Sequence, residues 1–406
     1  MDVLFLSPAY PPEMQQFTRG LAEVGARVWG VGDTPPGALP TALGRNLTGY
    51  LHVPAMGDED DVFRRVLAWL GGRRPDRIEA NWEPMTVLAA RLREALGLPG
   101  MSVDTVRGFR DKPLMRARVA AAGLRVPRSA RVRTGEEARA AAAAIGYPLV
   151  LKPVAGAGSA DTWRVDDPAA LEAALRATAH VAESSLEEFI AGEELTYETL
   201  CIDGRPVYES VCRYEPSALV ARKNAWISPI IQSFRSVEDP GVREGVRLGR
   251  AVLRALGMGT GFTHMEWFRL PNGEAVFGEI ACRPPGANMV DLMNYSDDGD
   301  LFREWARVVC HRRYEGPRAR PWSAAIVFKR AEGEGTIRHV TGMDAFRRAH
   351  APYIAREDLL PVGARRRDWT QTFLSDGNVV LRHPDMGETL RMARAFARDV
   401  RMYAGR

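Results

Sequence analysis

Residues 262–283 read Phe262-Thr-His-Met-Glu-Trp-Phe-Arg-Leu-Pro-Asn-Gly-Glu-Ala-Val-Phe-Gly-Glu-Ile-Ala-Cys-Arg283. Two segments rich in apolar and aromatic residues flank a Pro-Asn-Gly-Glu sequence, which is typical of a β-hairpin. Asn272-Gly273 is the preferred central pair of a two-residue type I′ turn, because both positions need a positive φ. The sequence therefore predicts two antiparallel strands joined at residues 272 and 273.

This turn would fix which side chains lie opposite one another. Glu266 would face Glu279, Phe268 would face Phe277, and His264 would lie on the glutamate face next to Glu266. Like charges directly opposite on a sheet are destabilising. A divalent cation between the carboxylates would remove that cost, and oxygen ligands suit magnesium. The alternative is a solvated strand face, where exposed charge is common.

Composition indicates an ordinary soluble globular protein with two to four lobes, since 46% of the 406 residues are hydrophobic and 26% are charged. No stretch approaches the roughly 20 apolar residues needed to cross a bilayer, and the first residues lack the basic region of a signal peptide. A net charge of +4 gives no case for a nucleic-acid partner. The four cysteines show no metal-site spacing and predict reduced thiols in a cytoplasmic protein.

Basic residues are almost all arginine: of the 55, only Lys112, Lys152, Lys223 and Lys329 are lysine. Such a bias suggests that arginine occupies most positions where either basic residue would serve. A lysine that remains is then a candidate for a position that needs a compact ammonium group, as phosphate binding does.

The chain opens with two short apolar runs, residues 2–6 and 26–31, around a helix-like stretch, which predicts a doubly wound β-α-β start. No Gly-x-Gly-x-x-Gly follows the first strand, so the dinucleotide fingerprint is missing. A buried strand at 148–153 then leads into a Gly/Ser-rich loop at 154–160 and another strand. Strand–loop–strand predicts a phosphate-covering hairpin, with a plain flexible turn as the alternative.

The C-terminal stretch, 316–406, has strands predicted at 323–329, 372–375 and 379–381 and a closing amphipathic helix at 386–403. Lys329 carries no motif, and a surface role is expected for it.

In order along the chain, these features resemble the carboxylate–amine ligases of the ATP-grasp superfamily, in particular the L-amino-acid ligase branch. The match covers roughly residues 106–290. The resemblance implies an α/β fold with α+β lobes in four parts. These are a Rossmann-like N-terminal domain (1–104), a lid subdomain (105–190), a catalytic subdomain (191–315) and a C-terminal lobe (316–406).

The resemblance also implies an ATP site. Lys112 and Lys152 would hold the α- and β-phosphates, and Glu194 would bind the ribose hydroxyls. Glu187 would accept from the adenine amino group, although Glu188 and Glu193 are adjacent acids and a one-residue slip stays open. The remaining nucleotide contacts are assigned to Gly156, Gly158 and Ser159 at the phosphates, to the backbone of Phe189 and Ile190 at the ring edge, and to Phe277 under the adenine, with core packing as its alternative.

For the chemistry, Glu266 and Glu279 would bind Mg²⁺, two ions in the family pattern, with Mn²⁺ as a substitute. Asn288 would ligate a metal or a phosphoryl oxygen. Arg283 and the Gly286 amide would bind the acyl-phosphate oxygens, and Lys223, with Arg222 as competitor, would close over the γ-phosphate. His264 is a candidate substrate contact or a packed strand histidine. Cys282 departs from the small residue or asparagine of many relatives.

The expected reaction is ATP-dependent amide formation through an acyl phosphate, on amino-acid-like carboxylate and amine substrates, in natural-product or dipeptide biosynthesis. A homodimer is implied by the resemblance alone. Two alternatives stay open: a phosphotransferase that acts on an alcohol, and a nucleotide-binding protein without turnover.

Overall fold

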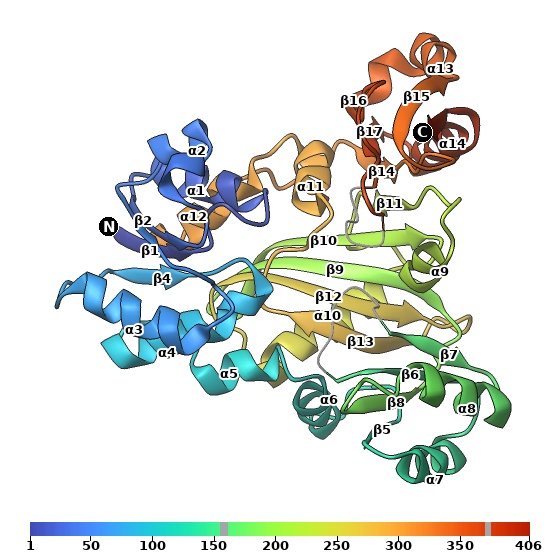
Figure 1. Cartoon of the computed structure of the whole chain (residues 1–406), viewed down its shortest axis with the longest axis horizontal. Coiled ribbons are helices and arrows are strands. Elements are labelled where there is room, and N and C mark those ends of the chain that lie inside the picture. The colour runs from blue at the N-terminus through green and yellow to red at the C-terminus, as the bar shows by residue number, and fades with distance from the viewer. Residues whose placement is uncertain (155–160, 370–374) are drawn as a thin grey trace.

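The structure is a computed structural model that describes residues 1–154, 161–369 and 375–406, without the side chains of Leu219, Arg222 and Lys223. Helices and strands are mixed throughout, which confirms the predicted α/β class. Figure 1 shows an N-terminal region in blue, a small green sheet at the lower right, a large central sheet, and a C-terminal region in red. In the described part of the chain, no helix is long and apolar enough to cross a membrane.

The N-terminal region is a four-stranded parallel sheet in the order β3-β2-β1-β4. Its strands are β1 (Asp2–Leu6), β2 (Arg27–Gly32), β3 (Gly49–His52) and β4 (Arg77–Glu79). The helices of this region are α1 (Met14–Glu23), α2 (Thr41–Arg45), α3 (Glu59–Leu70) and α4 (Thr86–Leu96). The strand order reverses at β1: β2 and β3 lie on one side of it and β4 lies on the other. Open α/β sheets bind ligands at the carboxyl ends of the strands at such a reversal, here β1 and β4.

The small sheet is antiparallel, in the order β5-β8-β6-β7, and follows the connecting helices α5 (Val103–Gly108) and α6 (Lys112–Ala121). Its strands are β5 (Ser129–Val132), β6 (Leu149–Pro153), β7 (Trp163–Val165) and β8 (Ser184–Glu188). Helices α7 (Gly135–Ile145) and α8 (Pro168–Ala177) complete its apolar core. A capping box between Thr134 and Glu137 fixes the start of α7.

The large sheet has eight strands in the order β13-β12-β9-β10-β11-β14-β17-β16. Its strands are β9 (Glu193–Ile202), β10 (Arg205–Glu215), β11 (Ile230–Ser233), β12 (Gly261–Arg269), β13 (Ala275–Ala281), β14 (Ser323–Phe328), β16 (Ile354–Leu359) and β17 (Gly377–His383). Helix α10 (Arg243–Leu256) packs on one face, where Tyr197 and Met265 are fully buried. The remaining helices of this region are α9 (Ala218–Lys223), α11 (Met289–Asp297) and α12 (Leu301–His311).

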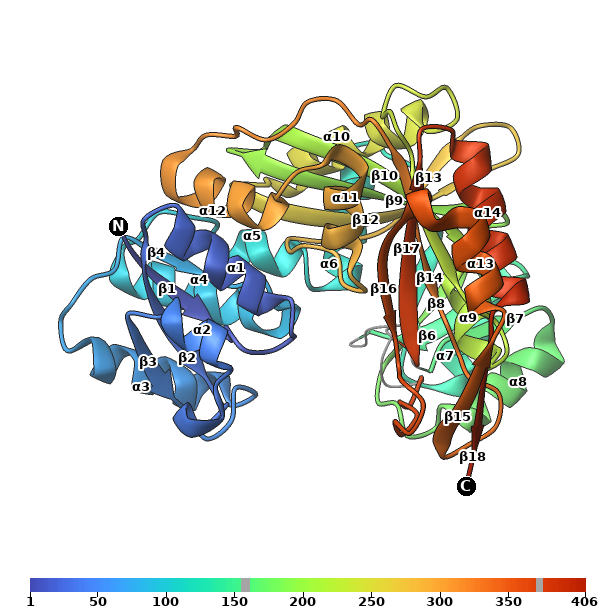
Figure 2. The ribbon, with the colours of Figure 1, turned by 90° about the horizontal axis from the view of Figure 1, so that it is seen from above.

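Three strands of the C-terminal region, β14, β17 and β16, extend the large sheet. Helices α13 (Met343–His350) and α14 (Met386–Asp399) lie along this end of the sheet (Figure 2). The closing helix was predicted to reach residue 403, but it ends at Asp399. The chain then extends as β18 (Arg401–Gly405), which pairs with β15 (Thr336–Thr341). The strand predicted at 372–375 falls largely outside the described residues.

Lys329 was expected to lie on the surface, but it is buried. Only 4% of the residue is exposed. Its ammonium donates to the Ala397 carbonyl at 2.7 Å and lies 5.9 Å from the centre of the Phe396 ring. Burial lowers its pKa to about 8. This lysine is part of the C-terminal core.

The hairpin of β12 and β13 pairs Glu266 with Glu279, as predicted, but its turn and its register differ from the predicted ones. The turn is not type I′. The Gly273 N–H donates to the Leu270 carbonyl at 2.9 Å, and Gly273 alone of the loop residues 271–273 has a positive φ, of 87°. This is a three-residue loop, which sets Trp267, not Phe268, opposite Phe277. A bulge at Gly278 then restores the glutamate pair.

The bulge requires glycine at 278, because an added Cβ would lie 2.7 Å from the Glu266 carbonyl oxygen. We expect Gly278→Ala to destabilise the protein by about 1–3 kcal/mol through this backbone clash, and to reduce ATP turnover by moving Glu279. Thermal unfolding and ADP release measure the two effects. Gly44→Ala is the matched control, since a Cβ there meets nothing within 4 Å. Wild-type stability and turnover in Gly278→Ala would contradict the close approach.

Candidate active site

The acidic pair stands on the face of the large sheet opposite α10. Glu266 and Glu279 are direct neighbours, and strand alternation places Glu194 of β9 and Phe268 of β12 on the same face. Among the described residues, no three carboxylate, imidazole or thiol side chains converge closely enough to hold a metal alone. Magnesium in nucleotide sites commonly takes one or two carboxylates and completes its shell with phosphate oxygens and water. The pair fits that kind of ligand set.

Negative charge accumulates at this pair. Burial, followed by the charges of Glu266 and Glu279, raises the pKa of Glu194 to about 8, even though the Ala218 N–H donates to it at 2.9 Å. Burial also disfavours the ionised form of Glu279, but Lys112 and Lys152 outweigh it and lower the pKa of Glu279. The site therefore combines carboxylates that repel one another with cations that offset them only in part.

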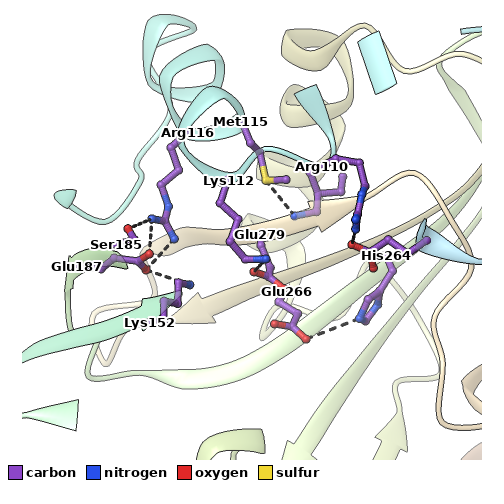
Figure 3. A network of polar contacts seen from close by, with 12 residues as sticks. Arg110, Lys112, Met115, Arg116, Lys152, Ser185, Glu187, His264, Glu266 and Glu279 are labelled. Carbon is purple, nitrogen blue, oxygen red and sulfur yellow. Dashed lines mark hydrogen bonds and ion pairs between the residues drawn. The ribbon is translucent and has the colours of Figure 1, made fainter. Parts of the chain in front are cut away.

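Two lysines approach the pair from different parts of the chain, as Figure 3 shows. Lys112, the first residue of α6, places its Nζ 3.3 Å from Glu279 Oε2. Lys152 lies on β6 of the small sheet, and its Nζ is 3.0 Å from Glu187 Oε2. Both were predicted to hold phosphates. The fold brings their ammonium groups to one polar network beside the acidic pair.

Glu187 does not sit at an open ring edge, where it was expected to meet adenine. Its side chain is only 6% exposed, and Arg116 donates to both of its oxygens, at 2.5 and 2.7 Å. Burial disfavours its ionised form, but Lys152 and Arg116 outweigh this and lower the pKa of Glu187. Because both oxygens already have cationic partners, the geometry favours a role in holding Lys152 (Figure 3). The adjacent acids Glu188 and Glu193 pair with Arg125 and Arg269.

The other residues predicted to contact adenine differ in how open the structure leaves them. The Phe189 N–H already donates to the Pro148 carbonyl at 3.1 Å, while Ile190 is 8% exposed. Phe277 is fully buried in the core that includes Trp267 and α10, which favours the packing alternative. One aromatic residue that shares the carboxylate face is Phe268, which pairs with Glu194 and is half-buried.

His264 occupies the position that its strand register predicted. Its Nδ1 donates to Glu198 Oε1 at 2.9 Å, and its Nε2 is 3.7 Å from Glu266 Oε1. Burial disfavours a charged imidazole, but the bonds to Glu198 and Glu266 outweigh it and raise the pKa of His264 to about 9. The imidazolium therefore links the fully buried Glu198 to the acidic pair.

Arg283 is held by a residue from the N-terminal region. Its Nε and Nη2 donate to Glu83 Oε2 at 3.0 and 2.8 Å, and Arg110 pairs with the other oxygen of Glu83. Burial disfavours the ionised form of Glu83, but Arg283 and Arg110 outweigh it and lower the pKa. Glu83 starts the short 3₁₀ helix η2 (Glu83–Met85), just past the carboxyl end of β4, so it lies where that sheet is expected to bind a ligand.

Gly286 and Asn288 precede α11. Gly286 is exposed, and a Cβ added there would meet nothing within 4 Å. Asn288 is the N-cap residue of α11 and has a φ of 55°. Gly156, Gly158 and Ser159 lie outside the described residues, and so do the side chains of Lys223 and Arg222, although α9, which carries the last two, is described.

Four polar residues of this site were missed in the sequence: Glu83, Arg110, Arg116 and Glu198. Arg116 lies one helical turn after Lys112, so helical spacing alone could have pointed to it. Glu83 follows a parallel strand, which is a known position for ligand-binding residues. Nothing local in the sequence marks Arg110 or Glu198.

Comparison with known proteins finds one matching domain and several related sequences. The model of the ATP-grasp domain matches residues 117–296. The L-arginine-specific L-amino acid ligase of Bacillus subtilis is 27% identical over 244 residues, and an alanine–anticapsin ligase of the same organism is 28% identical over 278 residues. These alignments cover 58% and 62% of this chain, and 58% and 57% of the relatives. The chain thus spans less than two thirds of the length of the curated relatives it matches.

Solved structures resemble the chain over its whole length. The L-amino acid ligase from Bacillus licheniformis superposes with a TM-score of 0.77 and 20% identity, covering 100% of this chain and 99% of that one. An N5-carboxyaminoimidazole ribonucleotide synthetase from Thermotoga maritima gives a TM-score of 0.72 at 16% identity. Residues 117–296 thus match the ATP-grasp domain, and the chain has the ATP-grasp fold.

Proposed function

We propose that this protein is an ATP-dependent carboxylate–amine ligase that forms an amide bond through an acyl phosphate and releases ADP and phosphate. The observation that carries the proposal is the network in which Lys112 and Lys152, from two parts of the fold, meet Glu187 and the Glu266/Glu279 pair. Cations beside paired carboxylates on a sheet suit a magnesium–triphosphate group. The names of the matched relatives support the same reaction class.

Each residue then has a task on the bound substrates. Lys112 and Lys152 would neutralise phosphate oxygens, and Glu194 would accept from the ribose hydroxyls. Glu266 and Glu279, with Asn288, would hold Mg²⁺, which neutralises charge on the transferring phosphoryl group when bound. Phe268 would pack against the adenine ring in place of Phe277, because it is an aromatic residue on the carboxylate face and pairs with Glu194.

In the first half-reaction a substrate carboxylate oxygen attacks the γ-phosphorus of ATP, and the bond to the β-phosphate oxygen breaks. This step gives ADP and an acyl phosphate. Arg283 and the Gly286 N–H would hold the oxygens of that intermediate. The amine then attacks the acyl carbon, phosphate leaves, and the amide remains. No protein nucleophile is needed, so the task of the chain is positioning and charge neutralisation.

The test is to incubate the protein with ATP, Mg²⁺ and L-amino acids, singly and in pairs. We expect ADP release that depends on the amino acids, with a product one water lighter than the sum of its two substrates by mass spectrometry. With an ¹⁸O-labelled carboxylate, label should appear in the released phosphate. ATP turnover with a phosphorylated alcohol, or ADP release without any amide, would count against the ligase, as would nucleotide binding without turnover.

A further inference from the structure

One side chain, Arg330, links the C-terminal region to the segment that borders the nucleotide site. Arg330 follows β14 and is only 8% exposed. Its Nη1 donates to the Ala221 carbonyl and to the Asn224 carbonyl, each at 2.7 Å. These two carbonyls lie at the end of α9. A single guanidinium thus holds the end of this six-residue helix.

The guanidinium is itself held firmly. Its Nε lies 3.4 Å from Ser375 Oγ, and its Cζ lies 4.3 Å from the centre of the Trp369 ring. The next residue along the chain, Ala331, donates its N–H to the fully buried Asp376 at 2.8 Å, and Arg366 Nε donates to the same carboxylate at 2.9 Å. Such a set of contacts leaves Arg330 little freedom to turn away from α9.

The other end of α9 meets the acidic face. The Ala218 N–H donates to Glu194 Oε2 at 2.9 Å, and Ala221 is 4% exposed. Helix α9 therefore spans the distance between Glu194 and Arg330. The contacts at its two ends therefore fix the backbone of α9 between the acidic face and the C-terminal region.

We propose that Arg330 is a positioning residue for ATP: it fixes α9 against the nucleotide site, so that the C-terminal region sets how this segment meets the phosphates. The inference rests on the proposed function, since it takes Glu194 and α9 to border bound ATP. Arginine suits the task because its Nη1 lies in a rigid planar group whose two N–H bonds point in fixed directions, whereas the ammonium of lysine rotates freely on a flexible stem.

The experiment compares Arg330→Met and Arg330→Lys with wild type and with Arg394→Met. Arg394 is a matched control, because it is also an arginine of the C-terminal region and pairs with Glu215 of β10. It is exposed, and no hydrogen bond or ion pair joins it to the described residues of α9. The measurements are Mg²⁺–ATP affinity by calorimetry, hydrogen exchange across residues 218–224, and the KM values for ATP and for the amino acids.

We expect Arg330→Met to weaken ATP binding about tenfold, the effect of losing roughly one net charged hydrogen bond, and to speed exchange at 218–224. Arg330→Lys should fall between this variant and wild type. The KM for the amino acids should change little, and Arg394→Met should behave as wild type. A purely structural role would instead lower the unfolding temperature and speed exchange around residues 375–383, with ATP affinity unchanged.

Wild-type ATP affinity in Arg330→Met, or unchanged exchange at 218–224, would overturn the proposal. Should Arg330→Met fail to fold, Arg330→Lys decides in the same way, because it keeps the buried charge. ATP affinity and exchange are read without amino acids. A failure of this proposal is therefore distinguishable from a failure of the ligase reaction, which the amide product alone decides.

Discussion

Glu279→Gln is expected to lower amino-acid-dependent ATP turnover by about a thousandfold while leaving the fold intact. The change keeps the shape of the side chain but removes half of the charge of the Glu266/Glu279 pair, and with it one anionic oxygen ligand for Mg²⁺. Metal-assisted charge neutralisation is worth several kcal/mol in the transition state, which corresponds to about that factor in rate. ADP release and thermal unfolding measure the two parts of the prediction.

The fold should tolerate this change because the carboxylate is only partly enclosed. The Glu279 side chain is 39% exposed, and its ionised form repels Glu194. Glu274→Gln is the matched control: it makes the same chemical change on the same hairpin, at an exposed residue next to the turn. Near-normal turnover in Glu279→Gln would remove this residue from the metal site.

Arg116→Met is expected to destabilise the protein by about 3 kcal/mol, the largest effect on stability that we predict. The Arg116 and Glu187 side chains are each 6% exposed, so the change leaves a buried carboxylate with Lys152 as its main cationic partner. Removing one partner of a buried pair typically costs about 3–5 kcal/mol, and Lys152 offsets part of this. Denaturant unfolding measures the change in free energy.

The double variant Arg116→Met/Glu187→Leu separates stability from ATP binding. Replacing a whole buried ion pair by apolar side chains is often neutral, so stability should return towards that of wild type. Lys152 would then lack the carboxylate 3.0 Å from its Nζ, and the KM for ATP should rise about tenfold, as when a hydrogen bond to a charged group is lost. An unchanged KM for ATP in the double variant would show that Glu187 does not position Lys152.

The hairpin of β12 and β13 shows which features could be predicted from the sequence and which could not. Asn272-Gly273 correctly placed a turn, and the predicted pair Glu266/Glu279 is correct, yet two local features were wrong. The loop has three residues rather than two, and a bulge at Gly278 offsets the difference. Turn type depends on the φ of each loop residue, and a bulge depends on close packing against the partner strand. Neither follows from the order of residue types, which is why Phe277 was placed on the wrong face.

Lysine scarcity was a useful but imperfect guide. It selected Lys112 and Lys152, which the structure brings into one polar network, and it says nothing by itself about Lys329. That residue is retained in an apolar core, where it reaches the Ala397 carbonyl. Composition can indicate that an ammonium group is needed at a position, but only the fold shows which group it contacts there.

Most of the site contacts that could not be predicted from the sequence join residues that are far apart in the chain. Glu83 and Arg283 are 200 positions apart, and Arg330 lies 109 positions after Ala221. Each pair meets because different strands end near the same region of the molecule. No local pattern marks such a contact in a single sequence, whereas Lys112 and Arg116 share one helix and could have been paired by spacing.

The central claim, that the paired glutamates hold the metal of a bound nucleotide, is tested most directly by counting metal ions. With a saturating non-hydrolysable ATP analogue, Mn²⁺ bound per chain can be measured by electron paramagnetic resonance. We predict two protein-bound ions in wild type and a loss of bound Mn²⁺ in Glu266→Gln/Glu279→Gln, with Glu274→Gln unchanged. The same amount of bound Mn²⁺ in the double variant as in wild type would contradict the account.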